Sequence, residues 1–448
     1  MVVPSKIFYP PLCTNHCSQS ILHPGIGCLR YFLNNLYNNC LGGFKYFSPL
    51  LITPLLLKLK TMDNELFLST LKYYLKTVGL TAMAASSSFY FICLFRNQLG
   101  SFQKYTTLFI PTVFGMQFCW FMPDKTLKLF CTATSQAVFE GILKQFPNLI
   151  TRLLLHSTSL QTFLFMINSA IILHFKRLKV YKGFWFMQPY GIEKSPSISA
   201  AGAAPLGAEG AMENIVDINA NIVEHSWKPR SQCVHGQTKC LKFILDGIKV
   251  GLTCGIPMDL LNALLKGGVP KGCKGILKVV AAKLKQFRPN MAGFFLLYGG
   301  IYRISSCLLY KYYGHLSRDL QHILAAFLGG ASYLWVDKVS FFTLSTVIAI
   351  QALWQEFCNR MSAAKKTSSN LVLKLLKDIS FSHVIFTLNM GYLVHNFIMN
   401  YEVLNSLTRG FLDGLSSNQT RIIRDTITKH SLDELMTIAN SHTVKRLL

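Results

Sequence analysis

Long stretches with almost no charge dominate the hydrophobic pattern of this chain. Six of them come close to the length of about 20 residues that a helix needs to cross the hydrocarbon core of a bilayer. Helices suit that environment because they satisfy their own backbone hydrogen bonds. The pattern therefore predicts an all-α, polytopic helical membrane protein. The six stretches are residues 78–95, 105–122, 158–175, 320–336, 339–354 and 381–399.

The second half of the chain resembles the first at a nearly constant offset. A histidine stands five residues before a cysteine in HPGIGCLRYF (23–32) and again in HGQTKCLKFI (235–244). An ordered series of matched positions at one period is typical of a duplicated module. The matched pairs are His23 with His235, Cys28 with Cys240, Cys93 with Cys307, Gly115 with Gly330, Trp120 with Trp335, Glu140 with Glu356, Asn168 with Asn389 and His174 with His395.

The duplication predicts two membrane repeats joined by a linker. The first repeat covers residues 1–188 with its Cys/His segment, and the second covers 233–448 with a C-terminal tail. Residues 189–232 are rich in Gly, Ala, Ser and Pro, as expected of a solvated linker. Each repeat holds five candidate helices, and the basic loops agree on one side of the membrane if four of the five cross. We therefore expect four to five hydrophobic helices per repeat.

Charge and motifs narrow the class of function. The chain has 45 Lys and Arg against 20 Asp and Glu, a formal net charge of +25. The basic residues lie between hydrophobic segments, so we expect them to meet anionic lipid headgroups rather than nucleic acid. No Walker loop, GxSxG or HExxH motif is present. We predict a protein that is not an enzyme and needs no cofactor.

Several sequence stretches resemble the transmembrane protein 135 family. They are HPGIGC (23–28) ahead of FKYFSPLLITPLLLKLK (44–60), FYFICLFRNQLGSF (89–102), CLLYKYYGHLSRDL (307–320) and HILAAFLGGASYLW (322–335). The resemblance implies a multipass protein of mitochondrial and peroxisomal membranes. It implies roles in mitochondrial fission and fusion balance, peroxisome organisation and lipid metabolism, with soluble organelle-division machinery as a partner.

A more distant likeness links each half to the four-span subunits of the mitochondrial inner-membrane translocases. In some of those a disulfide ties the start of the first span to the end of the second. Carried over, the bonds would join Cys28 to Cys93 and Cys240 to Cys307. That arrangement requires the first helix to span and leaves the fifth as the non-spanning element. It also implies an insertase-like or scaffold role as a third possibility.

The paired cysteines and histidines leave three interpretations open. Thirteen cysteines are scattered without a CxxC pair. A zinc site needs three or four converging ligands, which each half supplies without a recognised spacing. A metal, a pair of disulfides and plain packing all remain possible, and packing is the commonest fate of such residues. The metal candidates are Cys17, His23, Cys28, Cys233, His235 and Cys240.

Polar residues inside apolar stretches are the remaining candidates. Asn168, His174, Asn389 and His395 should either bond between helices or line a path. Glu140 and Glu356 raise the same question, and Arg303 is a candidate partner of Glu356. Small and aromatic residues at Gly115, Trp120, Gly330 and Trp335 suggest helix packing. A transporter or conduit for a lipid or metabolite is therefore the alternative to a non-catalytic regulator of the organelle.

Overall fold

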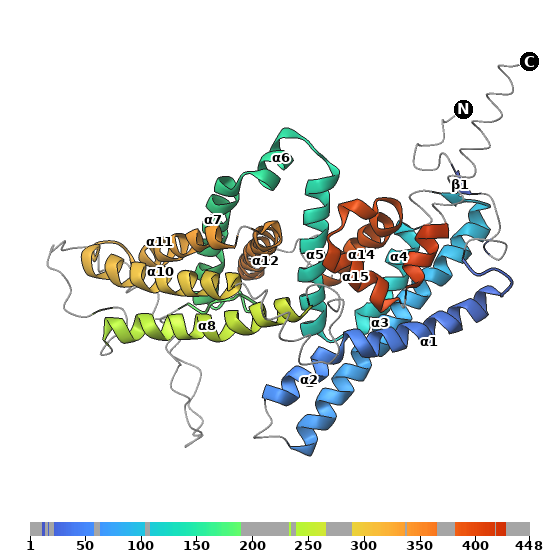
Figure 1. Cartoon of the computed structure of the whole chain (residues 1–448), viewed down its shortest axis with the longest axis horizontal. Coiled ribbons are helices and arrows are strands. Elements are labelled where there is room, and N and C mark those ends of the chain that lie inside the picture. The colour runs from blue at the N-terminus through green and yellow to red at the C-terminus, as the bar shows by residue number, and fades with distance from the viewer. Residues whose placement is uncertain are drawn as a thin grey trace, which may run out of the picture. The chain divides into compact units, whose positions relative to one another are not determined.

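A computed structural model describes most of the helical part of the chain (Figure 1). The described residues are 11–13, 17, 22–57, 63–103, 108–189, 233, 239–265, 289–336, 338–364, 381–416 and 418–426. All of the predicted linker 189–232 except its first residue, and the candidate ligand His235, lie outside them.

The chain divides into two compact units, and their boundaries differ from those of the predicted repeats. One unit combines residues 1–152 with 367–448, and the other is the continuous segment 153–366. The division follows helix packing: α14 (Phe381–Met399) packs on α5 (Asp124–Gln145), whereas α7 (Thr158–Arg177) packs on α12 (Val339–Ala364). Each unit therefore contains helices from both halves of the sequence.

In the first unit, α3 runs alongside α1, α2 and α4, while α14 packs on α4 and α5. A short antiparallel pair, β1 with β2, accompanies these helices. The elements are α1 (Cys28–Tyr46), α2 (Ser48–Leu57), α3 (Asn64–Leu99), β1 (Pro11–Cys13), β2 (Phe102–Gln103), α4 (Phe109–Gly115), the 3₁₀ helix η4 (Met116–Phe121), η7 (Tyr401–Val403) and α15 (Ser406–Leu415).

In the second unit, α10 packs on α8 and α11, and α7 packs on α11 and α12. Its elements, besides α7 and α12, are α8 (Cys240–Leu265), α10 (Asn290–Tyr312), α11 (Arg318–Gly329) and the 3₁₀ helix η5 (Gly330–Trp335). The short helix α6 (Leu149–His156) contains the boundary between the two units.

Two of the six uncharged stretches do not form a single α-helix. Within 105–122, α4 gives way to a 3₁₀ helix after Gly115, and within 320–336, α11 does so after Gly329. Close packing accompanies both changes. A Cβ on Gly115 would overlap Ser88 of α3, and one on Gly330 would lie 2.6 Å from the Cα of Met166. The tighter 3₁₀ turn is common in short pieces at helix ends.

Four of the described helices are long and apolar enough to cross a membrane. They are Asn64–Leu99, Thr158–Arg177, Asn290–Tyr312 and Val339–Met361. Of the two fifth helices, α7 meets this criterion and α14 does not, and neither of the two first helices, α1 and α8, meets it. The expectation that the first helix spans and the fifth does not stays a prediction.

Helix α1 reverses the usual arrangement of a helix in a soluble protein. Its polar Asn35 and Asn39 are buried, and Asn39 donates a hydrogen bond of 2.9 Å to Ser86 Oγ. Several of its large apolar or aromatic residues are exposed, whereas Tyr31 is buried. In water a helix buries its apolar stripe, so the reversed pattern fits a helix whose outer face meets lipid. The exposed residues are Leu29, Leu33, Tyr37, Leu41 and Phe44.

Candidate functional site

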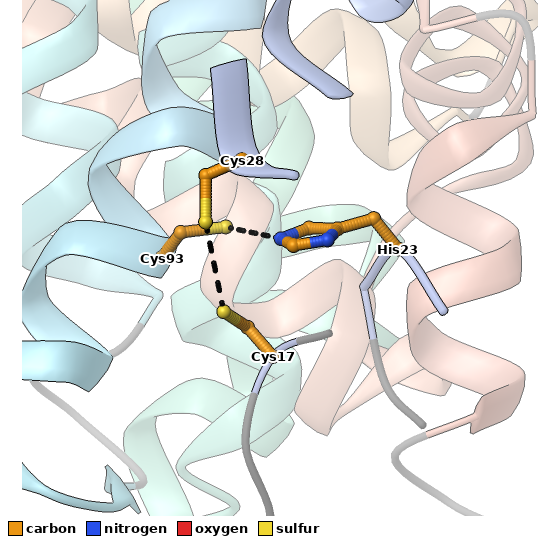
Figure 2. Close-up of side chains that lie close together, drawn as sticks. All are labelled: Cys17, His23, Cys28 and Cys93. Atoms are coloured by element: carbon orange, nitrogen blue, oxygen red, sulfur yellow. Dashed lines mark hydrogen bonds between the residues drawn. The ribbon is translucent and has the colours of Figure 1, made fainter. Parts of the chain in front are cut away.

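Three thiols and an imidazole converge at one point of the first unit (Figure 2). Cys17, His23, Cys28 and Cys93 each direct one ligand atom there, and these atoms all lie within 4.8 Å of one another. The sulfurs of Cys17 and Cys28 are 3.8 Å apart. Nε2 of His23 lies 3.3 Å from Cys93 Sγ. Residues 70 positions apart thus meet in one cluster.

The local sequence explains how these four residues reach the same point. In HPGIGC, a turn closes where the Ile26 amide donates to the His23 carbonyl, and Gly25 adopts a φ of +75° that favours glycine. The chain then enters α1 with Cys28 as its first residue. Cys93 comes from α3, which packs along α1. The turn therefore places His23 and Cys28 beside the C-terminal part of α3.

A backbone hydrogen bond determines the tautomer of His23. Its Nδ1 lies 2.7 Å from the Ile26 carbonyl, which can only accept, so Nδ1 carries the proton. Nε2 then presents its lone pair toward the sulfurs. The ring also packs on Tyr31 with centroids 4.8 Å apart. This is the orientation that metal-binding histidines receive from a carbonyl partner.

The cluster is closed to solvent. Cys17, His23 and Cys93 are at most 2% exposed, and Cys28 is partly buried. Burial, and next the adjacent Cys28 thiol, raise the pKa of Cys17, while the positive charge of Arg96 acts in the opposite direction. Such burial is costly for thiolates unless a cation compensates them.

A second cluster of three cysteines lies in the second unit. Cys233, Cys240 and Cys307 place their sulfurs within 4.8 Å of one another, and those of Cys233 and Cys240 are 3.6 Å apart. Cys240 is the first residue of α8, and Cys307 belongs to α10, which packs along α8. The cluster is more open than the first, because Cys240 is exposed and Cys233 only partly buried.

The structure brings the predicted disulfide partners together but holds them as thiols. Cys28 and Cys93 share the first cluster, and Cys240 and Cys307 share the second. All four are thiols rather than half-cystines. Each cluster contains three sulfurs, so a disulfide would use two and leave a third beside it. The sequence analysis named Cys17 and Cys233 among the metal candidates but did not anticipate that Cys93 and Cys307 join the same clusters.

The two matched asparagines make matching hydrogen bonds. Nδ2 of Asn168 donates to the hydroxyls of Ser345 and Thr346, both at 3.0 Å. Nδ2 of Asn389 donates to Thr134 Oγ1 at 3.3 Å and Ser135 Oγ at 2.8 Å. Each asparagine thereby joins the fifth helix of one half to the fourth helix of the other. On the same two helices, His395 is buried and His174 is partly buried.

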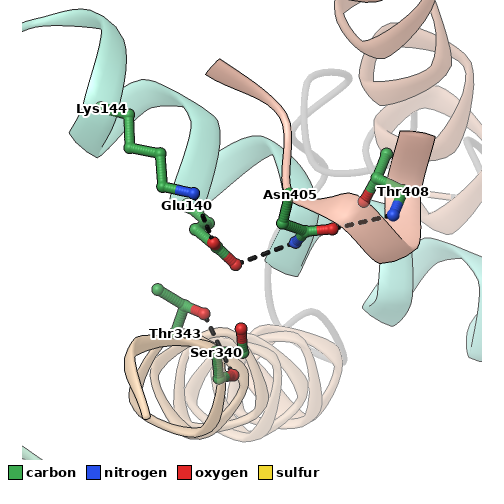
Figure 3. A network of polar contacts seen from close by, with 6 residues as sticks. All are labelled: Glu140, Lys144, Ser340, Thr343, Asn405 and Thr408. Atoms are coloured by element: carbon green, nitrogen blue, oxygen red, sulfur yellow. Dashed lines mark hydrogen bonds and ion pairs between the residues drawn. The ribbon is translucent and has the colours of Figure 1, made fainter. Parts of the chain in front are cut away.

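The predicted acidic residues have local partners. Glu140 accepts from Lys144 Nζ at 2.7 Å and from Asn405 Nδ2 at 2.9 Å, while Asn405 Oδ1 caps α15 by accepting from the Thr408 amide (Figure 3). Glu356 pairs with Arg360 at 2.6 Å.

The expected pairing of Arg303 with Glu356 is wrong. Arg303 donates to the Phe243 carbonyl, and its guanidinium lies 4.6 Å from the Phe243 ring centroid. Helix packing decided the outcome, because α8 is the direct neighbour of α10 and offers a carbonyl and an aromatic face. Glu356 meanwhile finds a partner one turn along its own helix.

The four predicted packing residues divide into two kinds. Gly115 and Gly330 are buried in close helix contacts. Trp120 and Trp335 are about half exposed, at 47% and 55%. Trp120 stacks on His383 with centroids 4.6 Å apart. Amphipathic tryptophans at helix ends are typical of the membrane interface.

Asp259 is a buried acid that the sequence reasoning missed. Its two carboxylate oxygens accept from the amides of Met291 and Ala292 at 3.0 and 2.8 Å, so α8 caps the start of α10. An acid inside the apolar stretch GIPMDLLNALL (255–265) was the available signal. Helix starts attract carboxylates because their amides are unsatisfied.

A buried aromatic network in the second unit was also missed. Trp185 Nε1 donates to Tyr298 Oη at 2.9 Å, and Tyr298 and Ser169 share a bond of 2.6 Å. Ser169 in turn donates to the Ala326 carbonyl at 2.8 Å, so Tyr298 is the donor to Ser169. Because the network joins α7, α10, α11 and the segment after α7, no local pattern reveals it.

The described part of the chain is nearly all helical, and its four long apolar helices suggest a helical membrane protein. Comparison with known proteins finds no matching family, no similar curated protein and no similar solved structure.

Proposed function

We propose that the chain is a non-catalytic multipass protein of mitochondrial and peroxisomal membranes. In this proposal it regulates mitochondrial fission and fusion balance, peroxisome organisation and lipid metabolism, and it contacts soluble division machinery. The organelles and roles rest on the sequence resemblance. The observation that carries the non-catalytic part is that the inward-facing polar residues Asn168, Asn389 and Glu140 bond to neighbouring helices, as structural contacts do.

The architecture in this proposal is a tandem duplication with exchanged fifth helices. Support comes from equivalent packing in the two units. In the first, α14 packs on α4 and α5; in the second, α7 packs on α11 and α12. The paired asparagines and the two cysteine clusters occupy corresponding elements. The exchange would tie the two repeats into one molecule.

Imaging and replacement of the linker test the regulatory function. We expect the tagged chain to colocalise with both mitochondria and peroxisomes, and its depletion to change mitochondrial length. Replacing residues 193–230 with a Gly/Ser linker of equal length should preserve localisation and abolish rescue of mitochondrial length. The matched control reinserts the native segment. A secretory or plasma-membrane pattern, or full rescue by the Gly/Ser variant, would contradict the proposal.

One observation favours a lipid or metabolite conduit as the second candidate. Nδ1 of His174 is buried and makes no hydrogen bond within the described residues. His174 also lies within electrostatic range of His322 on α11. A partly buried ionisable group with a buried ring nitrogen, on a candidate spanning helix, is the kind of residue that lines substrate or proton paths.

Reconstitution separates the two candidate functions. The purified chain in liposomes should show flux of a lipid or metabolite if it is a conduit, and His174→Ala with His395→Ala should abolish that flux. Asn168→Ala with Asn389→Ala is the control for general loosening of the same helices. Absence of flux together with intact rescue of mitochondrial length would leave the regulatory function.

A further inference from the structure

We propose that Cys17, His23, Cys28 and Cys93 bind one zinc ion as a closed, structural site, and that Cys233, Cys240 and Cys307 supply three ligands to a second. Neither site follows from the proposed membrane function. The inference rests on ligand geometry, on the orientation of His23 and on the recurrence of the cluster.

Two ligand–ligand distances in the first cluster are close to those of a tetrahedral zinc site, and the others are at most 4.8 Å. With Zn–S of about 2.3 Å and Zn–N of about 2.0 Å, tetrahedral ligands lie about 3.8 Å apart for two sulfurs and about 3.5 Å apart for sulfur and nitrogen. The observed separations are 3.8 Å between Cys17 and Cys28 and 3.3 Å between Cys93 and His23. Three cysteines and one histidine form a common structural zinc set.

The surroundings also suit a metal ligand set. The Nδ1 hydrogen of His23 is committed to the Ile26 carbonyl, which leaves Nε2 as the ligand atom. Three thiolates and a dipositive ion carry a net charge of −1, and Arg96 supplies a positive charge within electrostatic range of Cys17. Burial of the ligands leaves no open coordination position for substrate, so the site is structural rather than catalytic.

Recurrence makes a chance cluster a poor explanation. In each unit, one cysteine begins a helix (Cys28 or Cys240), and a second comes from the helix packed along it (Cys93 or Cys307). A third arrives from the segment before the first helix. Zinc uses every sulfur in each cluster, whereas one disulfide would leave a sulfur over. The ion would link the segment before each first helix to the helix pair.

Metal content of the full-length chain tests the proposal. The chain is purified in detergent without chelator, and zinc is measured per chain by inductively coupled plasma mass spectrometry. We expect about two equivalents, falling to about one in Cys93→Ser and about one in Cys307→Ser. Cys119→Ser and Cys131→Ser are matched controls, because both are buried cysteines of the first unit outside the cluster. They should retain two equivalents.

Two further measurements separate ligand loss from unfolding. His23→Cys should retain zinc as a four-thiolate site, whereas His23→Ala should lose one equivalent. Cobalt substitution of the wild-type chain should give the visible bands of tetrahedral cobalt with thiolate-to-metal charge transfer, and these should shift in His23→Cys. The shift reports ligation directly and not general stability.

Each other result has a defined meaning. Absence of stoichiometric zinc overturns the proposal, as does an iron–sulfur chromophore. A disulfide between Cys28 and Cys93, found by alkylation and mass spectrometry without reductant, overturns it as well. One equivalent that is lost in Cys93→Ser but kept in Cys307→Ser supports the first site and overturns its extension to the second.

Discussion

At the scale of single residues, the polar groups within the helices are the most informative. Asn168 and Asn389 each bond two adjacent hydroxyls, and Glu140 accepts from both a lysine and an asparagine. Buried polar groups are costly unless bonded. Apart from Lys144, which lies one turn from Glu140 on α5, their partners were not predictable from the sequence, because those bonds join residues more than 170 positions apart.

The asparagines should contribute modestly to stability. Asn168→Ala and Asn389→Ala should each lower the free energy of unfolding by about 0.6 kcal/mol, the average for hydrogen bonds between membrane helices. Unfolding of the purified chain in mixed micelles, titrated with a denaturing detergent, measures the change. Thr132→Ala, an exposed hydroxyl on α5 that bonds its own helix, is the control. A stabilising effect of either asparagine variant would contradict the role assigned to these bonds.

A negative charge at position 405 should destabilise the fold. Asn405→Asp keeps the acceptor that caps α15 but replaces the donor to Glu140 with a carboxylate. We expect a loss of about 1.5–3 kcal/mol at neutral pH, the range for hydrogen bonds to charged groups. Lys144 pairs with Glu140 at 2.7 Å, which leaves the second carboxylate without that compensation.

The pH dependence and a second substitution distinguish charge repulsion from the loss of the helix cap. Acidification protonates one carboxylate and removes the repulsion, so Asn405→Asp should approach the wild-type stability as pH falls. Asn405→Ser caps the helix without a charge and should show no such recovery. Thermal unfolding across pH provides the measurement. Equal stability of Asn405→Asp and wild type at neutral pH would show that the bond to Glu140 is unimportant.

At the scale of elements, the sequence predicted where most helices lie, but it did not predict where an α-helix changes to a 3₁₀ helix. Uncharged stretches correctly located α3, α7, α12 and α14. The stretches 105–122 and 320–336 look equally continuous, but both change to 3₁₀ geometry. The cause lies in neighbouring helices: Gly115 fits against Ser88, and Gly330 against Met166.

Glycine substitutions test that account. Gly115→Ala should destabilise the chain by about 1–3 kcal/mol, the usual cost of overpacking, because the added methyl group overlaps Ser88. Gly79→Ala in α3 is the matched control. A Cβ there meets nothing within 4 Å, so the higher helix propensity of alanine should stabilise by up to about 1 kcal/mol. Unfolding in detergent distinguishes the opposite signs, and equal effects would contradict the packing explanation.

At the scale of the whole molecule, the compact units do not follow the order of the helices along the chain. The predicted segments were 1–188 and 233–448, but the second compact unit is residues 153–366 and the first draws on both ends of the described chain. The periodicity of each helix reveals which face is apolar. It does not reveal which of two similar helices will pack there.

Fragments should follow the compact units rather than the sequence repeats. Residues 153–366 should form a protease-resistant species in detergent, because α7, α8, α10, α11 and α12 pack on one another within it. Residues 233–448 alone should be degraded, because α14 lacks α4 and α5. Coexpression of 1–188 with 233–448 should restore resistance. Limited proteolysis followed by mass spectrometry measures all three, and a resistant 233–448 fragment would contradict the exchange.

The sequence by itself determined the class of protein. Length and hydropathy are local properties, so runs of uncharged residues were enough to predict membrane helices and a nearly all-α fold. The matched series also indicated which cysteines belong together. Only the tertiary structure decided that α7 packs on α11 and α12 while α14 packs on α4 and α5, that Arg303 bonds α8, and that Cys93 joins Cys17, His23 and Cys28 in one cluster. These outcomes depend on contacts between segments that are far apart in the sequence. Several helices have similar apolar faces, and a single sequence does not indicate which of them pack together.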